Sequence, residues 1–368
     1  MNAVIKILAG VLFLAGCAHR PKVESDFSTR MDSLFHSVPD FSGVVLVADQ
    51  GLPVYHRAFG FADIATQQKT DTASIFELAS VSKQFTATLI AILSEEGKLN
   101  YDDPIEKFLP GLPYPGITIR QLLNHTSGLP DYQALMDQKW DKSKVAGNDD
   151  IIAYLKKYKP ASLFAPGDKY EYSNTGYVLL GSIVEKASGK DFVDFCRARV
   201  FRPLAMTSTD IRTKAQKDSI KSFALGYIFV AEKNRYVRAD SFPASNYTIW
   251  LGARKGPGRI SSTSSDLLRW DRALRANRLI KESTWQEMIS PARLNDGSQS
   301  MYGMGWMLRD DSTSGRIVFH TGDNPGYKTE IIRYAQPDRT VIVLCNNAHA
   351  QFDALVRAIE KLMIKKKA

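Results

Sequence analysis

A serine and a lysine lie three residues apart, at Ser80 and Lys83, where a polar stretch of the chain gives way to an apolar run. If the run from Phe85 to Leu93 is helical, this spacing places both side chains on one face of the helix, one turn apart. A serine hydroxyl is a weak nucleophile until a base takes its proton, and a neighbouring amine can be that base. A helix N-terminus also favours an oxygen that gains negative charge. The pair therefore predicts a serine nucleophile with its own base, suited to attack on a carbonyl carbon.

Two further motifs follow along the chain, and each occurs once. Tyr172-Ser173-Asn174 is the only Tyr-x-Asn sequence, and His320-Thr321-Gly322 is the only one in which histidine or lysine precedes Ser/Thr-Gly. Together with Ser-x-x-Lys, in this order, they resemble the active-site signature of the serine beta-lactamase and penicillin-binding protein superfamily. The resemblance is strongest to its class C beta-lactamase-related branch, which includes D-Ala-D-Ala carboxypeptidases and esterases. It covers about residues 30 to 365 and includes four longer stretches: Leu122 to Leu129, Tyr172 to Tyr177, Gly258 to Leu267 and His320 to Tyr327.

The resemblance implies a role for each catalytic residue. Ser80 would form an acyl-enzyme, and Lys83 would lower the cost of ionising its hydroxyl. Tyr172 would be the second base, which passes the proton to the leaving group and then activates the deacylating water. A phenol ionises near pH 10, so Tyr172 would need cationic neighbours, which Lys83 and His320 could supply. The sequence leaves open which of Lys83 and Tyr172 holds the proton at rest.

The same resemblance assigns the binding groups. Asn174 would point its amide at the substrate beside the scissile bond; the alternative is a turn asparagine. His320-Thr321-Gly322 would be the edge strand along which an extended substrate lies, and Gly322 would allow close backbone approach. The oxyanion hole would consist of the backbone N–H groups of Ser80 and Asp323. A small residue is common at the latter position in the family, so the carboxylate of Asp323 must point away from the oxyanion.

The pattern of elements along the chain predicts an α+β fold, with helices and a hairpin at one end and consecutive strands at the other. Helical spacing covers Phe27 to Val38, and a hairpin is expected between Val44 and Phe59. The resemblance implies one antiparallel sheet shared by both chain ends and flanked by helices. It also implies a mainly helical lobe over roughly residues 99–225, with the active site in the cleft between them. Later strands are expected over Met304 to Leu308, Arg316 to His320, Thr329 to Tyr334 and Thr340 to Leu344, followed by a helix from Asp353 to Met363.

The first residues resemble an export signal. The apolar run from Ile7 to Leu14 is too short to span a bilayer and is typical of a signal peptide. It ends in Leu14-Ala15-Gly16-Cys17, which resembles a bacterial lipobox; the alternative is an ordinary signal peptide or uncleaved anchor with an incidental cysteine. We expect a signal peptide over residues 1–16, a lipidated N-terminus and tether over residues 17–26, and a hydrolase domain over residues 27–368.

These expectations imply an exported lipoprotein whose Cys17 carries the lipid. It would be anchored to a bacterial membrane on the periplasmic or cell-surface side, and to the outer membrane if the host has one. With Cys17 acylated, Cys196 and Cys345 remain, and their apolar surroundings favour buried free thiols. No histidine or cysteine pattern has metal-ligand spacing, so neither a metal nor another cofactor is expected.

The composition is that of an ordinary globular protein, with 44% hydrophobic and 24% charged residues among 368. The formal net charge is +9. No zinc knuckle, phosphate-binding loop or basic-aromatic stripe accompanies that charge, so no nucleic-acid partner is expected. A weak attraction to an anionic membrane or wall polymer, or a merely solvated surface, accounts for the excess.

The expected function is hydrolysis of an amide or ester through an acyl-serine intermediate, with a cell-wall-type D-amino-acid peptide as the substrate class. A promiscuous esterase and a beta-lactamase are alternatives on the same residues, and His320 in place of lysine is more typical of the peptidase and esterase members. The alternative from another class is a catalytically silent sensor of peptidoglycan fragments. The intact set of Ser80, Lys83 and Tyr172 argues against it. The substrate itself is not fixed by fold likeness.

Overall fold

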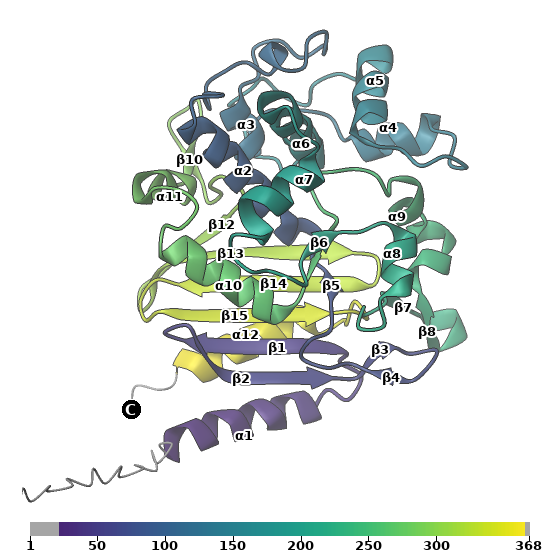
Figure 1. Cartoon of the computed structure of the whole chain (residues 1–368), viewed down its shortest axis with the longest axis vertical. Helices are drawn as coiled ribbons and strands as arrows, with labels where there is room; N and C mark the ends of the chain where they lie inside the picture. The colour runs from purple at the N-terminus through teal and green to yellow at the C-terminus, as the bar shows by residue number, and fades with distance from the viewer. Residues whose placement is uncertain (1–21, 365–368) are drawn as a thin grey trace, which may run out of the picture.

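A six-stranded antiparallel sheet forms the body of the computed structural model, which describes residues 22–364 (Figure 1). The strand order β12-β13-β14-β15-β1-β2 places the N-terminal hairpin beside the C-terminal strands. The strands β1 and β15 join the two chain ends in a register that sets Val45 opposite Val343. Both strands are almost wholly buried and rich in valine, isoleucine and leucine, as expected of strands covered on both faces.

The remaining elements surround this sheet or form smaller ones. The helices are α1 (Lys22–His36), α2 (Lys83–Glu95), α3 (Ile119–Leu123), α4 (Tyr132–Lys139), α5 (Asn148–Tyr158), α6 (Asn174–Ser188), α7 (Phe192–Cys196), α8 (Lys214–Ser219), α9 (Tyr247–Trp250), α10 (Ser264–Arg275), α11 (Glu282–Met288) and α12 (Phe352–Ile364). The strands are β1 (Gly43–Asp49), β2 (Leu52–Phe59), β3 (Phe61–Asp63), β4 (Gln68–Lys69), β5 (Phe76–Glu77), β6 (Asp210–Ile211), β7 (Tyr227–Val230), β8 (Arg235–Arg238), β9 (Ile260–Ser262), β10 (Ala292–Arg293), β11 (Gln299–Ser300), β12 (Met307–Asp311), β13 (Gly315–Asn324), β14 (Tyr327–Tyr334) and β15 (Arg339–Cys345).

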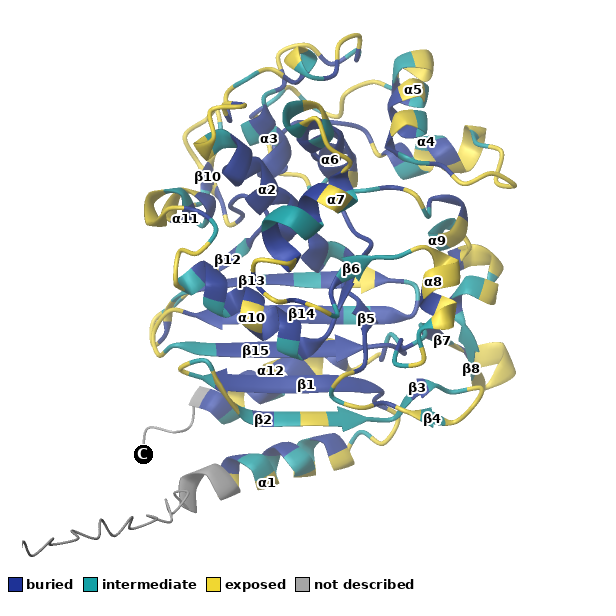
Figure 2. Ribbon diagram, viewed as in Figure 1, coloured by how far each residue is buried: buried dark blue, intermediate teal, exposed yellow. Residues whose placement is uncertain are grey.

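Successive residues of the central strands enter two different cores, because side chains alternate across a strand. Val44 and Leu46 of β1 belong to the larger core, which includes residues of α2, α6 and α10. Val45 and Val47 belong to the smaller core on the opposite face, with residues of α1 and α12. Figure 2 shows the inner strands and α2 as buried, whereas much of α4, α5 and α8 is exposed.

The helix α2 lies at the centre of the larger core. Its residues from Lys83 to Leu93 are all buried, so it is covered on every side. The helices α3 to α7 form a lobe beyond it, above the sheet in Figure 1. The first residue of α2 is therefore held between this lobe and the sheet, where its position is set by packing from both.

The α+β fold is confirmed, and so are the expected N-terminal hairpin, the four consecutive C-terminal strands and the final helix. Several boundaries differ; the strand expected from Arg316 to His320, for example, runs from Gly315 to Asn324. The strand expected from Met304 begins at Met307, after a turn in which Gly305 has a φ of +79°. The helix α1 begins at Lys22, so residues 22–26, expected in the tether, are helical.

The two remaining cysteines, Cys196 and Cys345, are buried free thiols, as expected from their apolar surroundings. Cys17 and the signal-peptide region lie outside the described residues. Within residues 22–364, no helix is both long and apolar enough to cross a membrane.

Candidate active site

The turn that carries Ser80 leads directly into the buried helix α2. It is a 3-10 turn over Ala79–Ser82, and the α-helix starts at Lys83. Ala79 has a φ of +48°, in the left-handed region that residues with a Cβ rarely adopt. Backbone strain of this kind persists only where the surroundings hold it in place. The residue before the nucleophile is therefore held in a conformation that the local sequence alone disfavours.

Contacts from two strands supply that restraint. The N–H of Leu78 donates to the carbonyl oxygen of Ile260 in β9 at 2.9 Å. The Leu78 carbonyl oxygen accepts from the Thr329 hydroxyl of β14 at 2.8 Å. A Cβ on Gly322 of β13 would collide with this same carbonyl oxygen, so glycine is required for the strand to pass so close. The nucleophile turn and the third motif thus lie in direct contact.

Lys83 is fully buried, and its Nζ lies 3.0 Å from the Oγ of Ser80. It also contacts two oxygens that can only accept, the Oδ1 of Asn174 at 2.8 Å and the carbonyl of Pro257 at 3.0 Å. Burial, reinforced by the nearby charge of Arg254, holds the pKa of Lys83 well below its usual value. A neutral amine has two hydrogens for these two oxygens and one lone pair left for the Ser80 hydroxyl. The geometry therefore fits a base poised on the nucleophile.

The ring of Tyr172 lies beside this amine, with its centroid 4.7 Å from the Nζ of Lys83. Among the described residues its buried hydroxyl makes no hydrogen bond of normal geometry. Burial raises the pKa of Tyr172 well above its usual value, although the adjacent Ser80 side chain partly offsets this rise. The phenol is therefore protonated at neutral pH and free to donate.

His320 is buried and neutral, and both of its ring nitrogens are occupied. Its Nδ1 lies 2.6 Å from the carbonyl oxygen of Thr321, so this nitrogen carries the hydrogen and donates. Its Nε2 then accepts from the hydroxyl of Tyr302 at 2.9 Å. Burial and the neighbouring Lys83 lower the pKa of His320 to about 3. The expectation that His320 supplies a positive charge to Tyr172 is therefore wrong, because desolvation keeps the imidazole neutral.

This neutral state predicts a flat pH response. We expect the KM of a carboxylate-bearing D-peptide to show no inflection from His320 between about pH 5 and pH 8, since the imidazole does not titrate in that range. KM should be measured against pH for the wild type and for His320→Gln, with a neutral ester as the control substrate. A KM that rises through about pH 6.5 in the wild type but not in the variant would mean that His320 binds the substrate as a cation.

His125 and Tyr302 belong to the same buried cluster, and neither was predicted from the sequence to lie in the site. The Nδ1 of His125 accepts from the backbone N–H of Ser173 at 3.1 Å. Its ring also lies 4.3 Å from that of Tyr172 and 4.6 Å from that of Tyr302, centroid to centroid. A positive φ of +60° at His125, just after α3, makes this placement possible.

The third motif lies on a free edge of the sheet. The strand β12 pairs with β13 only as far as Phe319, so residues 320–324 have no strand partner on that side within the described chain. The side chain of Asp323 is 74% exposed, with a carboxylate oxygen 3.6 Å from the Nζ of Lys328. It is thus directed into solvent, as an oxyanion hole at its backbone N–H requires. Asn174 is the first residue of α6 and is exposed.

Comparisons with known proteins show the family to which this chain belongs. The sequence model of the Beta-lactamase family matches residues 31–362. Penicillin-binding protein 4* of Bacillus subtilis is 40% identical over 339 residues, which are 90% of this chain and 75% of that protein. A D-aminopeptidase of Cereibacter sphaeroides is 27% identical over 86% of this chain, which spans 59% of that longer protein.

A solved structure is similar to this chain in both fold and sequence. The D-amino acid amidase of Ochrobactrum anthropi, complexed with D-phenylalanine, has a TM-score of 0.76 and 25% identity, covering 93% of this chain and all of that one. The chain described here therefore belongs to the Beta-lactamase family and is a serine hydrolase.

Proposed function

We propose that the protein hydrolyses amide bonds formed by D-amino acids, as in cell-wall peptides, through an acyl-enzyme on Ser80. The observation that carries the proposal is the buried amine of Lys83, 3.0 Å from the Ser80 hydroxyl and with a strongly lowered pKa. The substrate class is supported by the D-aminopeptidase and the D-amino acid amidase, which share sequence and fold with this chain.

Acylation begins when the Oγ of Ser80 attacks the substrate carbonyl carbon and its proton moves to the Nζ of Lys83. The carbonyl oxygen becomes an oxyanion that the backbone N–H groups of Ser80 and Asp323 stabilise. When the C–N bond breaks, the leaving nitrogen takes the proton of the Tyr172 hydroxyl, and the proton on Lys83 replaces it. This step leaves a free amine, an acyl-serine and the two catalytic side chains in their starting states.

Deacylation reverses the proton path. A water molecule attacks the acyl-serine, and its proton passes through Tyr172 and Lys83 to the departing Oγ of Ser80. The products are a carboxylic acid and the free hydroxyl of Ser80. These reaction steps do not depend on a charge on His320, because none of them requires His320 to gain or lose a proton.

Ester hydrolysis is a second candidate, and the neutral state of His320 favours it. Neither His320 nor Lys83 offers a fixed positive charge to a substrate carboxylate, so neutral acyl donors fit the site without an unpaired anion. Rates should be compared for D-amino-acid amides, D-Ala-D-Ala peptides and p-nitrophenyl esters, and a fluorescent penicillin tests acylation directly. Ester turnover without turnover of any D-amide would favour the esterase, and no acylation of Ser80 by any of them would contradict both functions.

We propose in addition that the protein is a membrane-anchored lipoprotein, because a short apolar segment ends in Leu-Ala-Gly-Cys at Cys17. Cys17→Ser is expected to release the protein from membranes or to leave an unprocessed precursor. Fractionation and the mass of the mature N-terminus are the measurements, with Cys196→Ser as a matched control that should keep wild-type processing. Unchanged processing and membrane attachment of the Cys17→Ser protein would contradict the proposal.

A further inference from the structure

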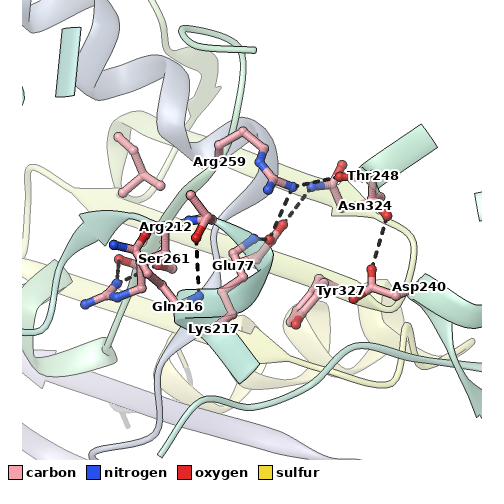
Figure 3. A network of polar contacts seen from close by, with 12 residues as sticks. Glu77, Arg212, Gln216, Lys217, Asp240, Thr248, Arg259, Ser261, Asn324 and Tyr327 are labelled. Carbon is pink, nitrogen blue, oxygen red and sulfur yellow. Dashed lines mark hydrogen bonds and ion pairs between the residues drawn. The ribbon is translucent and has the colours of Figure 1, made fainter. Parts of the chain in front are cut away.

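A single buried carboxylate, that of Glu77, lies three residues before the nucleophile and contacts three other segments of the chain (Figure 3). It forms an ion pair with Lys217 of α8, which is also buried. Its Oε1 lies 3.5 Å from the Nη1 of Arg259, a buried residue just before β9. Its Oε2 accepts a hydrogen bond of 3.3 Å from the Nδ2 of Asn324, the last residue of β13.

Two of these partners adjoin groups of the catalytic site. Asn324 directly follows Asp323, whose backbone N–H is the proposed second donor of the oxyanion hole. Arg259 follows Pro257 by two residues, and the carbonyl of Pro257 accepts from Lys83 at 3.0 Å. Glu77 itself is joined to Ser80 by only two intervening residues. The Glu77 carboxylate therefore connects three segments. They carry the nucleophile Ser80, the Pro257 carbonyl that binds Lys83, and the proposed oxyanion donor at Asp323.

Burying these charged groups costs more free energy than a purely structural contact would require. Burial, with help from neighbouring cations, lowers the pKa of Lys217 well below its usual value and that of Arg259 to about 10. The Nε of Arg259 is buried without a hydrogen-bond partner among the described residues. Its backbone has a φ of +81°, which is unfavourable for a residue with a side chain. Apolar side chains commonly fill such a space at equal or lower free energy, so fold stability alone does not account for the cluster.

We propose that Glu77 is a positioning residue, whose carboxylate sets the distance between Ser80 and the end of β13 and thereby aligns the two donors of the oxyanion hole. Such alignment matters because oxyanion donors act only when they lie at hydrogen-bond distance from the developing charge. The contact with Asn324 is the direct tie to β13, and the contact with Arg259 holds the segment that orients Lys83. This inference rests on the proposed acyl-serine function.

Glu77→Gln removes the negative charge of the carboxylate. Asn324→Ala removes only the hydrogen bond between Glu77 and β13. We expect either change to lower kcat about 10- to 100-fold, less than the loss of about 10²–10³ that follows removal of a whole oxyanion donor. KM should stay within about threefold. The affinity for a boronic acid, which places a tetrahedral oxygen in the hole, should weaken by the same factor as kcat. Lys83 contacts neither residue, so the acid limb of the pH–rate profile should not move.

Asp240→Asn is the matched control. Asp240 accepts from the Thr248 hydroxyl at 3.2 Å in the same region but contacts neither the nucleophile turn nor β13 (Figure 3). The Asp240→Asn substitution should change kcat less than about twofold.

If Glu77→Gln does not fold, the inference is tested with Asn324→Ala and with the double variant Glu77→Gln/Lys217→Met, which removes the unpaired cation. Thermal unfolding of each variant separates lost stability from lost alignment.

Two results would overturn the inference: unchanged boronate affinity in Asn324→Ala, or equal losses of kcat in Asn324→Ala and Asp240→Asn. Acylation by a p-nitrophenyl ester reports on Ser80 whatever the natural substrate is. If the wild type is not acylated at Ser80, the proposed function fails. If it is acylated and the variants react equally fast, only the role of Glu77 fails.

Discussion

Ser80→Ala is expected to lower kcat/KM by about 10⁴- to 10⁶-fold, the scale of loss seen when a catalytic nucleophile is removed. The reason is that Lys83 then has no hydroxyl to deprotonate, and the acyl-enzyme cannot form. Fold stability should change little. Ser80 is only partly buried, and the two carbonyl-type contacts of Lys83, to Asn174 and Pro257, remain. The variant should therefore unfold near the wild-type temperature.

The measurement is mass mapping after treatment with an activated ester or a penicillin, together with steady-state rates. Ser82 in the same turn offers a matched control, because its hydroxyl accepts from the backbone N–H of Ile260 at 3.2 Å and does not contact Lys83. The adduct should vanish in Ser80→Ala and persist in Ser82→Ala. An adduct that persists in Ser80→Ala, or that maps to another residue in the wild type, would show that Ser80 is not the nucleophile.

The sequence was sufficient to predict that Ser80 and Lys83 lie side by side, and to predict much of the sheet. The spacing of Ser80 and Lys83 is a local property of one helix start. The β-branched residues of the C-terminal segments are likewise a local pattern, and they predict strands. Both follow from residues close together in the chain. The start of α1 at Lys22 was missed, because the polar residues before Phe27 show no apolar stripe.

The protonation states of the site could not be predicted, because they depend on burial by distant segments. Burial and the neighbouring Lys83 keep His320 neutral, and its Nε2 is hydrogen-bonded to Tyr302. No feature of the His-Thr-Gly motif indicates this burial. No pattern in the sequence places His125 beside Tyr172. Its proximity to Tyr172 arises from the packing of α3 against α6, which the sequence pattern does not specify. The hairpin β7–β8 was also not predicted, since aromatic and charged residues alternate there without a clear period.

The two bases can be separated by their dependence on the leaving group. Lys83→Met removes the amine but keeps a long side chain in the buried space, and acylation should fall about 10²- to 10⁴-fold for amides and esters alike. Every acylation needs the Ser80 proton to be taken. In the wild type, activity should fall as pH drops through the lowered pKa of Lys83, because only the neutral amine accepts a proton.

Tyr172→Phe should act differently, because the phenol donates its proton to the leaving group. Acylation by an amide should fall at least about 10²-fold, since an amine cannot leave without a proton. Acylation by a p-nitrophenyl ester should be nearly unchanged, because p-nitrophenolate leaves as an anion, whereas deacylation should slow for both substrates. The change should cost little stability, because the Tyr172 hydroxyl has no hydrogen-bond partner within residues 22–364. Burst and steady-state rates for a matched amide and ester, measured in both variants, separate these steps. Equal loss of ester and amide acylation in Tyr172→Phe would assign the phenol to activation of Ser80, and near wild-type rates in both steps would leave it a structural role.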